Sequence, residues 1–332
     1  MRPVTRFQVL DRRQVIGGLT AAAGVAACDG AEDAPLVPSS VDPIAPITSN
    51  EDFYVTSCCG TPAVDGAAWS LTVRTATATL ASIDLAGLMA LEGREREHTL
   101  ECIGANPYNQ AISNAVWTGL PLTEVFAALG VEVPATTIEL VMYCADGYST
   151  SLPIGDLDEP IWLVWLMNGE PLPPDHGFPA RMLVPGRYGM KNPKWILDLE
   201  LTDLHHTGFW EQYGWSYEAV YQPNTLVRHP DRTVSVVAGP VVVQGTAFAG
   251  RDAVVRVEVS VDGGPWVEAA LDYAPGPDVW ALWRFDWLAE LGTHVLQARC
   301  VTASGAQSGL DPEGTDPMSG YDGSMEVEVQ VV

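Results

Sequence analysis

From about residue 228 onward, the sequence consists of short apolar runs at regular spacing, separated by turn residues. Residues 255–261 alternate between apolar and polar side chains, and Asp262-Gly263-Gly264 then supplies a hairpin turn. Regularly spaced short strands without helical periodicity are typical of two antiparallel sheets packed face to face. The sequence therefore predicts an all-β sandwich over residues 229–332, and we find no catalytic cluster in it.

The preceding residues, 49–228, combine predicted helices with predicted strands. Residues 121–129 predict a helix, with Pro121 near its start and Gly130 just past its end, and residues 83–91 predict a shorter one. Residues 69–74 alternate like a strand and 98–102 are strand-like, and further strands are predicted at 137–148, 161–174, 180–186 and 194–203. The predicted fold class is α+β, with a mixed domain followed by the all-β domain.

The first 28 residues have the layout of an export signal. Arg12-Arg13 precedes a Gly- and Ala-rich apolar run that is too short to cross a membrane as a helix. The arginine pair resembles a twin-arginine signal, and the run ending in Cys28 resembles a lipobox, in which that cysteine is acylated after cleavage. The alternative is an ordinary cleaved signal in which Cys28 is incidental. We expect a lipoprotein on the periplasmic side, attached to the membrane only through its lipid.

Residues 29–48 contain Pro, Ser and acidic residues without periodicity, so we expect a flexible tether there. The whole chain carries a formal net charge of -25. Nucleic acids and anionic lipid surfaces are bound through Lys and Arg, so this charge argues against both as partners. It permits steering of a basic protein partner, although solubility alone explains it equally well.

Cysteine and histidine motifs of common metal sites are missing. The sequence has no haem-attachment C-x-x-C-H, no paired C-x-x-C and no H-E-x-x-H, and His205-His206 is expected to be a solvated pair. Cys58 and Cys59 are neighbours, and a bond between them would close a strained ring, so we expect free or separately packed thiols. Cys144 and Cys300 lie in apolar strands, where a buried inert thiol is the default.

Two segments carry candidate chemistry. Cys102 ends a predicted strand and faces a Gly/Asn/Pro loop, so its thiol is either a core residue or a ligand aimed into a cleft. Residues 176–195 concentrate five basic or histidine side chains in a chain with 17 Lys and Arg in total. Clustered cations and tight turns suit an anionic group such as a phosphate, whereas the alternative is a solvated surface loop.

These segments resemble the signatures of the sulfite oxidase family of molybdenum enzymes. The runs LECIGANPYN and AVWTGLPL resemble the family's strand–cysteine–loop, and residues 167–195 resemble its long central signature. ITSNEDFYV, ADGYSTSLP and FWEQYGW match further family segments, and the C-terminal sandwich is similar to the family's dimerisation domain. The resemblance covers residues 47–332 approximately. It implies a mixed α/β molybdopterin-binding domain at 49–228, an immunoglobulin-like sandwich at 229–332, and a homodimer.

The resemblance also implies site residues. One molybdenum atom would be held by the dithiolene of a single molybdopterin and by the thiolate of Cys102, and metal binding needs that deprotonated sulfur. Tyr108 and Trp117 are expected as pocket walls, with core packing as the alternative for each, and Arg187 or Lys191 as a substrate-binding cation. The cofactor-binding residues implied are Asn50, Phe53, Tyr54, Ala145, Asp146, His176, Arg181, Asn192, Pro193 and Lys194.

The implied reaction is two-electron oxygen-atom transfer, with sulfite or a related small sulfur compound as substrate. With no haem motif in the sequence, electrons are expected to pass to a separate carrier, for which a basic c-type cytochrome suits the acidic chain. Sulfite-oxidising members carry an arginine in the loop after the ligand cysteine, whereas the loop here, IGANPYN, has no cation. Reduction of a sulfoxide, such as methionine sulfoxide, is therefore an alternative. A non-catalytic lipid-anchored binding protein is another, which the retained Cys102 argues against.

Overall fold

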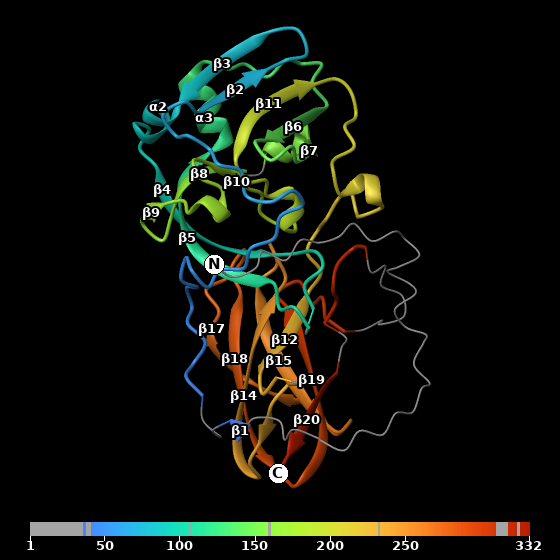
Figure 1. The fold of residues 1–332 in the computed structure, drawn as a ribbon. Helices are drawn as coiled ribbons and strands as arrows, with labels where there is room; N and C mark the ends of the chain where they lie inside the picture. The colour runs from blue at the N-terminus through green and yellow to red at the C-terminus, as the bar shows by residue number, and fades with distance from the viewer. Residues whose placement is uncertain are drawn as a thin grey trace, which may run out of the picture.

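The computed structural model describes residues 36–37, 41–106, 108–158, 161–231, 233–309, 318–323 and 326–332. The predicted export signal at 1–28, with Cys28, lies outside the described residues. In the part of the chain that is described, no helix is both long and apolar enough to cross a membrane. Figure 1 shows two bodies stacked end to end, with the sheets of the N-terminal half above and those of the C-terminal half below.

One five-stranded sheet of the N-terminal half has the order β3-β2-β11-β6-β7. Alternation in the sequence of β2 matches its burial, since Leu71 and Val73 are fully buried and Ser70 is exposed. β11 runs parallel to β2 and antiparallel to β6, so strands distant in sequence form the centre of this sheet. The strands are β2 (Ser70–Arg74), β3 (Thr79–Asp84), β6 (Glu139–Cys144), β7 (Ser149–Pro153) and β11 (Ile196–Thr202).

A second five-stranded sheet has the order β10-β8-β5-β4, with β9 paired to β8. β4 and β5 pair antiparallel with Glu101 opposite Ile112, which leaves residues 102–111 as the connecting loop. A Cβ on Gly119 of β5 would lie 2.1 Å from the carbonyl oxygen of Leu163, so glycine is needed where β5 meets β8. The strands are β4 (Arg94–Glu101), β5 (Ile112–Pro121), β8 (Trp162–Met167), β9 (Glu170–Pro171) and β10 (Arg181–Leu183).

Helices are short in the described residues. The predicted helix at 121–129 is confirmed as α3 (Leu122–Leu129), which ends at Gly130 in the left-handed conformation with φ 67°. The helix predicted over 83–91 is shorter, α2 (Leu85–Met89), because β3 continues to Asp84, whose side chain accepts a hydrogen bond from the Gly87 N–H. The 3-10 helices are η2 (Ile154–Asp158), η3 (Pro174–His176), η4 (Gly189–Lys191) and η5 (Glu211–Tyr213).

The C-terminal half is built from strands alone in the described residues, in sheets of order β1-β13-β20-β19-β15-β16 and β12-β14-β18-β17. Valines of both sheets, with Trp283, form one shared core, which confirms the predicted all-β sandwich. The strands are β1 (Leu36–Val37), β12 (Asn224–His229), β13 (Ser235–Val236), β14 (Gly239–Phe248), β15 (Val254–Val261), β16 (Val267–Glu268), β17 (Ala270–Tyr273), β18 (Ala281–Ala289), β19 (Gly292–Thr302) and β20 (Val327–Val331).

The described chain is mostly β, so the α+β label overstates its helical content. The apolar runs between the predicted helices form strands, and the two α-helices cover only a small part of the N-terminal half. The immunoglobulin-like character of the sandwich remains a prediction. β12 spans the predicted domain boundary at residues 228–229 and pairs with β14 along its length.

The described part of the predicted tether packs against both halves. β1 pairs in parallel with β13. The Pro46 carbonyl accepts hydrogen bonds from Asn114 Nδ2 at 2.9 Å and from Trp280 Nε1 at 3.0 Å. Residues 42–48 of the predicted tether therefore make hydrogen bonds at the junction, and the flexible character of residues 29–48 stays a prediction.

A further apolar cluster joins the two halves at this junction. It combines Ile103 and Ile112, on either side of the 102–111 loop, with Tyr188 and Tyr221 and with Phe248 of β14. The rings of Tyr188 and Tyr221 are 4.6 Å apart between centroids. The cluster fixes the loop that begins with Cys102 against the sandwich.

His98 of β4 is fully buried, and neither ring nitrogen has a hydrogen-bond partner. Burial, followed by the positive charges of Arg96 and Arg181, lowers its pKa to about 3. The unfolded chain therefore binds more protons than the folded chain below pH 6.5, and stability falls as the pH drops below that value. We expect His98→Gln to remove about 1.5 kcal/mol of the destabilisation between about pH 6.5 and about pH 5.

Urea unfolding of the wild-type protein and of His98→Gln at both pH values measures this contribution. The change in the free energy of unfolding between the two pH values is compared for the two proteins, so a cost of the substitution that does not depend on pH cancels. An unchanged pH dependence in His98→Gln would show that His98 becomes protonated in the folded protein.

Candidate active site

Cys102 is the first residue after β4. Its N–H donates to the Ala111 carbonyl at 2.9 Å, and its own carbonyl accepts from the Ala105 N–H at 2.8 Å, so the chain turns at once. Asn109 Nδ2 donates to the Gly104 carbonyl at 2.8 Å across the same loop. The thiol is not part of a disulfide, and it lines a cavity. A strand end and a hydrogen-bonded turn thus present this sulfur to open space.

The cavity opens to solvent, and the space inside it that the centre of a water molecule can occupy is about 210 Å³. Three segments distant in sequence supply most of its wall: residues 53–58, 102–109 and 176–195. The full lining consists of Phe53, Tyr54, Thr56, Ser57, Cys58, Leu100, Cys102, Ile103, Gly104, Asn109, Asp146, Tyr148, His176, Arg181, Gly189, Met190, Asn192, Pro193, Lys194, Trp195, Trp210 and Trp215.

Arg181 is a buried cation in this wall, held by backbone carbonyls. Its two terminal nitrogens donate to the carbonyls of His176 at 3.0 Å and Asn192 at 3.1 Å, and its guanidinium lies 5.1 Å from the ring centroid of Trp117. Nε of Arg181 is buried and has no partner. Burial lowers the pKa of Arg181 to about 10, so it remains charged at neutral pH. A buried cation with an unused donor fits an anionic ligand.

Lys194 and His176 accompany Arg181. Lys194 Nζ donates to the Asp175 carbonyl at 2.8 Å, and burial, followed by the charge of Arg181, lowers its pKa to about 7. His176 Nε2 lies 2.8 Å from the Asn50 carbonyl, and burial lowers its pKa to about 4. The neutral imidazole therefore donates through Nε2 and keeps Nδ1 as an acceptor.

Asn192 holds the turn that joins this basic segment to Cys102. Its Oδ1 accepts from the Val184 N–H at 2.6 Å, and its Nδ2 donates to the carbonyls of Arg187 and Tyr188. In the same turn, a Cβ on Gly189 would lie 3.0 Å from the Tyr54 hydroxyl and 3.9 Å from the Cα of Cys102. The absence of a side chain at 189 lets the turn pack against the Cys102 wall.

The Cys102 thiol lies in a different electrostatic setting. Burial raises its pKa, while hydrogen bonds from the Gly104 N–H and the Thr56 hydroxyl act in the opposite direction. Glu101 carries a buried carboxyl, and burial raises its pKa to about 8. The free thiol is therefore protonated at neutral pH, and a metal ion would bind it by displacing the proton.

A family model described as an oxidoreductase molybdopterin binding domain matches residues 59–210. Rat mitochondrial sulfite oxidase is 32% identical over 190 residues, which cover 49% of this chain and 35% of the rat protein. Chicken sulfite oxidase is 29% identical over 322 residues, which cover 82% of this chain and 69% of the chicken protein.

The solved structure of the sulfane dehydrogenase SoxCD from Paracoccus pantotrophus has a similar fold. Its TM-score is 0.75 with 20% sequence identity, over 89% of this chain and 85% of that chain. Residues 59–210 therefore form a molybdopterin-binding oxidoreductase domain, and the chain is similar to the sulfite oxidases. The match spans about a third of the length of the rat protein and 41% of the human mitochondrial sulfite oxidase.

The residues of the cavity fit molybdopterin, the cofactor for which the matching domain is named. A pterin phosphate needs cations and unused donors, which Arg181 and Lys194 supply, and the unpartnered Nε of Arg181 is such a donor. A deprotonated thiol is a metal ligand, and Cys102, which is not part of a disulfide, lies in the same cavity. His176 and Asp146 add polar groups for the pterin ring.

Nine of the predicted site residues line this cavity together. They are Phe53, Tyr54, Cys102, Asp146, His176, Arg181, Asn192, Pro193 and Lys194. Asn50 and Ala145 lie behind the wall: the Asn50 carbonyl faces His176, and the Ala145 N–H donates to the Trp195 carbonyl at 2.9 Å. Asn50 and Ala145 therefore do not line the cavity themselves, but they hydrogen-bond to His176 and Trp195, which do.

Three predicted catalytic residues lie elsewhere. Trp117 is fully buried and donates from Nε1 to the His98 carbonyl at 3.0 Å. It therefore packs in the core, which is the predicted alternative to a pocket wall. Tyr108 is 65% exposed and does not line the cavity. Arg187 pairs with Asp156 at 2.7 Å and with Glu218 at 2.8 Å outside the cavity. These pairs hold Arg187 away from the cavity in this arrangement, and its substrate-binding role stays a prediction.

Sequence reasoning missed several lining residues. Trp210 and Trp215 come from the FWEQYGW run, which carried the family resemblance without a predicted site role. Thr56 contacts the Cys102 sulfur, and Met190 lines the wall beside it. Pairs of tryptophans in an irregular loop are a usable signal, because exposed loops rarely hold two large aromatic side chains without a cavity to cover.

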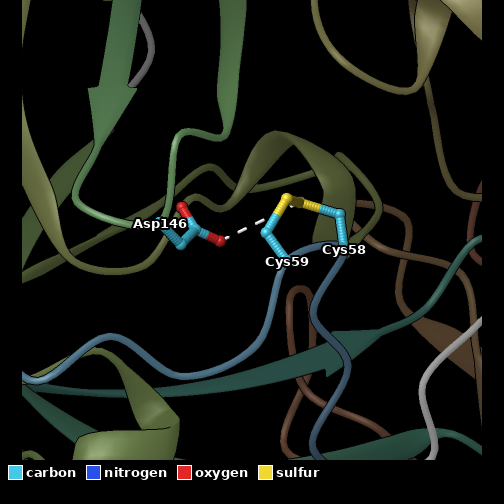
Figure 2. A group of neighbouring side chains, drawn as sticks. All are labelled: Cys58, Cys59 and Asp146. Atoms are coloured by element: carbon cyan, nitrogen blue, oxygen red, sulfur yellow. Dashed lines mark hydrogen bonds between the residues drawn. A yellow bond between two sulfur atoms is a disulfide. The ribbon is translucent and has the colours of Figure 1, made fainter.

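Cys58 and Cys59 form a disulfide, so the prediction of separate thiols is wrong. Figure 2 shows this pair beside Asp146, whose Oδ2 lies 3.9 Å from the sulfur of Cys58. The two sulfurs and a carboxylate oxygen lie within 4.8 Å of one another, but the sulfurs are bonded to each other and not free for a metal ion. The disulfide forms part of the cavity wall at Cys58.

Alkylation of the denatured, unreduced protein followed by mass spectrometry tests this bond. We expect label on Cys102, Cys144 and Cys300, and label on Cys58 and Cys59 only after reduction, since a disulfide has no thiolate to react. Labelling of all five without reductant would contradict the structure.

Proposed function

We propose that this protein is a molybdenum-dependent oxidoreductase that transfers an oxygen atom to or from the sulfur of a small compound, with sulfite or a related compound as the substrate class suggested by its relatives. The observation that carries the proposal is the cavity that combines the free thiol of Cys102 with the buried Arg181 and the half-buried Lys194. A thiolate ligand and an anion site in one cavity are what a molybdopterin requires.

The residues of the chain divide the work of holding the cofactor. Arg181 and Lys194 would bind the phosphate, His176 and Asp146 the pterin, and Cys102 the metal. The bound group would supply two-electron oxygen-atom chemistry. Electrons would then leave singly to a separate carrier, for which a basic c-type cytochrome complements the net charge of -25.

Tyr54 contributes a neutral hydroxyl to the reaction end of the cavity. Burial raises its pKa well above the usual value, so the phenol stays protonated at neutral pH and can donate a hydrogen bond. Its oxygen lies close to Gly189, which in turn packs against Cys102.

Steady-state assay of the molybdenum-loaded protein tests the proposal. Sulfite and an artificial electron acceptor form one arm, and sulfoxides with a reduced dye form the other. We expect turnover in at least one arm and a stoichiometric molybdenum content. Full-length protein that is purified with the pterin but turns over none of these compounds would favour the non-catalytic alternative, a lipid-anchored binding protein on the same fold.

We also propose that the protein is exported by the twin-arginine route and anchored through Cys28 on the periplasmic side. A Cys28→Ala variant should move from the membrane fraction to the soluble fraction, and continued membrane association would refute lipidation. A homodimer through an immunoglobulin-like sandwich is proposed from the family resemblance. Light scattering over a wide concentration range tests it, and a persistent monomer would count against it.

A further inference from the structure

The end of the sandwich that lies far from the cavity carries exposed aliphatic side chains. Leu288 and Leu291, at the turn between β18 and β19, are 73% and 75% exposed, more than any other large hydrophobic side chain among the described residues. Val237, in the turn between β13 and β14, is 48% exposed, and Val332, which follows β20, is 54% exposed. Each of these side chains lies beyond or at the end of a strand.

Strand pairing brings these positions to the same end of the sandwich. The Ala238 N–H donates to the Val332 carbonyl at 2.9 Å, which joins the β13–β14 turn to the end of β20. Gly292, directly after Leu291, lies opposite Val331 in the β19–β20 pair. We call this apolar end the sandwich tip, and it consists of Val237, Leu288, Leu291 and Val332.

The length of β14 separates the sandwich tip from the loop that begins with Cys102. β14 starts at Gly239, next to the tip, and ends at Phe248, which packs in the cluster that contains Ile103 of that loop. The strand has 10 residues, so it spans about 30 Å. The tip and the cavity therefore lie at opposite ends of the sandwich.

The predicted tether leads from the predicted lipid site to the tip. Leu36, the first residue of β1, follows Cys28 by eight residues, which span at most about 29 Å when fully extended. β1 pairs with β13, which ends directly before Val237. Figure 1 shows β1 at the lower end of the sandwich, close to the end marked C. A lipid on Cys28 would therefore hold this end of the sandwich near the bilayer.

The composition of the tip suits an uncharged lipid surface. Its two turns, residues 233–240 and 286–294, contain no Lys or Arg, and they carry the acidic residues Asp286 and Glu290. Anionic lipids attract basic residues, so they are not the expected partner. Exposed leucines instead gain free energy when they move from water into the boundary between headgroups and acyl chains.

A second copy of the chain is a poorer occupant of the tip. A stable protein–protein interface buries about 800 Å² on each partner and uses about 20–30 residues a side. Four aliphatic side chains at strand ends supply far less. A bilayer requires no complementary shape, and a lipid anchor would already keep its surface at a high local concentration.

We propose that the sandwich tip inserts its aliphatic side chains into an uncharged lipid surface, as a second membrane contact besides the lipid on Cys28. The inference rests on the lipid anchor proposed above and goes beyond it, because it fixes which end of the protein touches the bilayer. The loop that carries Cys102 then stands about 30 Å from the membrane surface, where a soluble electron carrier can reach it.

Spin labels at the tip of the full-length acylated protein test this inference. Leu288→Cys and Leu291→Cys are labelled and bound to phosphatidylcholine vesicles, and collisions with oxygen and with a water-soluble nickel chelate give the depth of each label. We expect both labels about 5–10 Å inside the boundary between headgroups and acyl chains. Leu204→Cys, at a position that is 70% exposed in the N-terminal half, should stay in water. The wild-type protein, treated in the same way, gives the background from its own thiols.

A pair of serine substitutions measures the strength of the contact. The double variant Leu288→Ser with Leu291→Ser should speed the transfer of acylated protein between vesicles by at least about tenfold, because each buried leucine side chain contributes about that factor. Leu204→Ser is the matched control and should leave the transfer rate unchanged. Thermal unfolding of each variant verifies that it folds.

Labels at positions 288 and 291 that stay in water on acylated, vesicle-bound protein would overturn the inference and leave the lipid anchor intact. Spin–spin broadening of these labels that grows with the concentration of the soluble Cys28→Ala protein would also overturn it, in favour of a second copy at the tip. An intact mass without acyl chains on Cys28 would refute the anchor, and with it the orientation. The failure of the anchor and the failure of the tip contact are therefore distinguishable.

Discussion

Cys102→Ser is expected to lower the turnover of the wild-type substrate by more than about 100-fold, because even partners of metal ligands contribute about 10- to 100-fold and this residue would be the ligand itself. Cys102 is the free thiol among the residues that line the cavity. The serine hydroxyl is harder and far less acidic, so it would not replace the thiolate. The readouts are steady-state rate and molybdenum per chain.

Cys300→Ser is the matched control for this substitution. Cys300 is also free and fully buried, but it lies in the core of the sandwich. Its substitution should leave turnover per molybdenum unchanged within about twofold. Equal losses in the two variants would mean that the effect comes from folding and not from the metal.

Arg181→Met is expected to weaken cofactor retention by about 10- to 100-fold, the range for losing hydrogen bonds from a charged group. The substitution removes a buried cation and also leaves the carbonyls of His176 and Asn192 without their donor. The measurement is the fraction of pterin that stays with the protein through gel filtration, compared at equal folded protein.

Arg187→Met is the control, because it removes the same charge from an ion-paired arginine outside the cavity. We expect its cofactor retention to match the wild type and its stability to fall by about 1 kcal/mol. If the two variants lost cofactor equally, the assignment of the anion site to the Arg181 end would be incorrect.

The sequence predicts the parts of this site that depend on short-range pattern. Cys102 follows a strand-like run and precedes turn residues, so its place at a loop start is readable from the chain. Arg181 and Lys194 lie within one Gly- and Pro-rich segment, so they were expected near each other. The regular strands after residue 228 likewise predict the sandwich from local spacing.

Side-chain direction and distant partners were not predictable in this way. Trp117 lies in β5, and its side chain points into the core because of the register between β4 and β5. Arg187 is turned away by Asp156 and Glu218, each 31 residues distant in sequence. Trp210 and Trp215 sit in an irregular loop whose path no periodicity defines.

X-ray absorption at the molybdenum edge of the loaded protein tests the central claim most directly. If Cys102 is the protein ligand, the wild-type spectrum should require one more sulfur at the metal than the dithiolene provides, and Cys102→Ser should lose that sulfur alone. Identical sulfur counts in the two proteins would contradict the account.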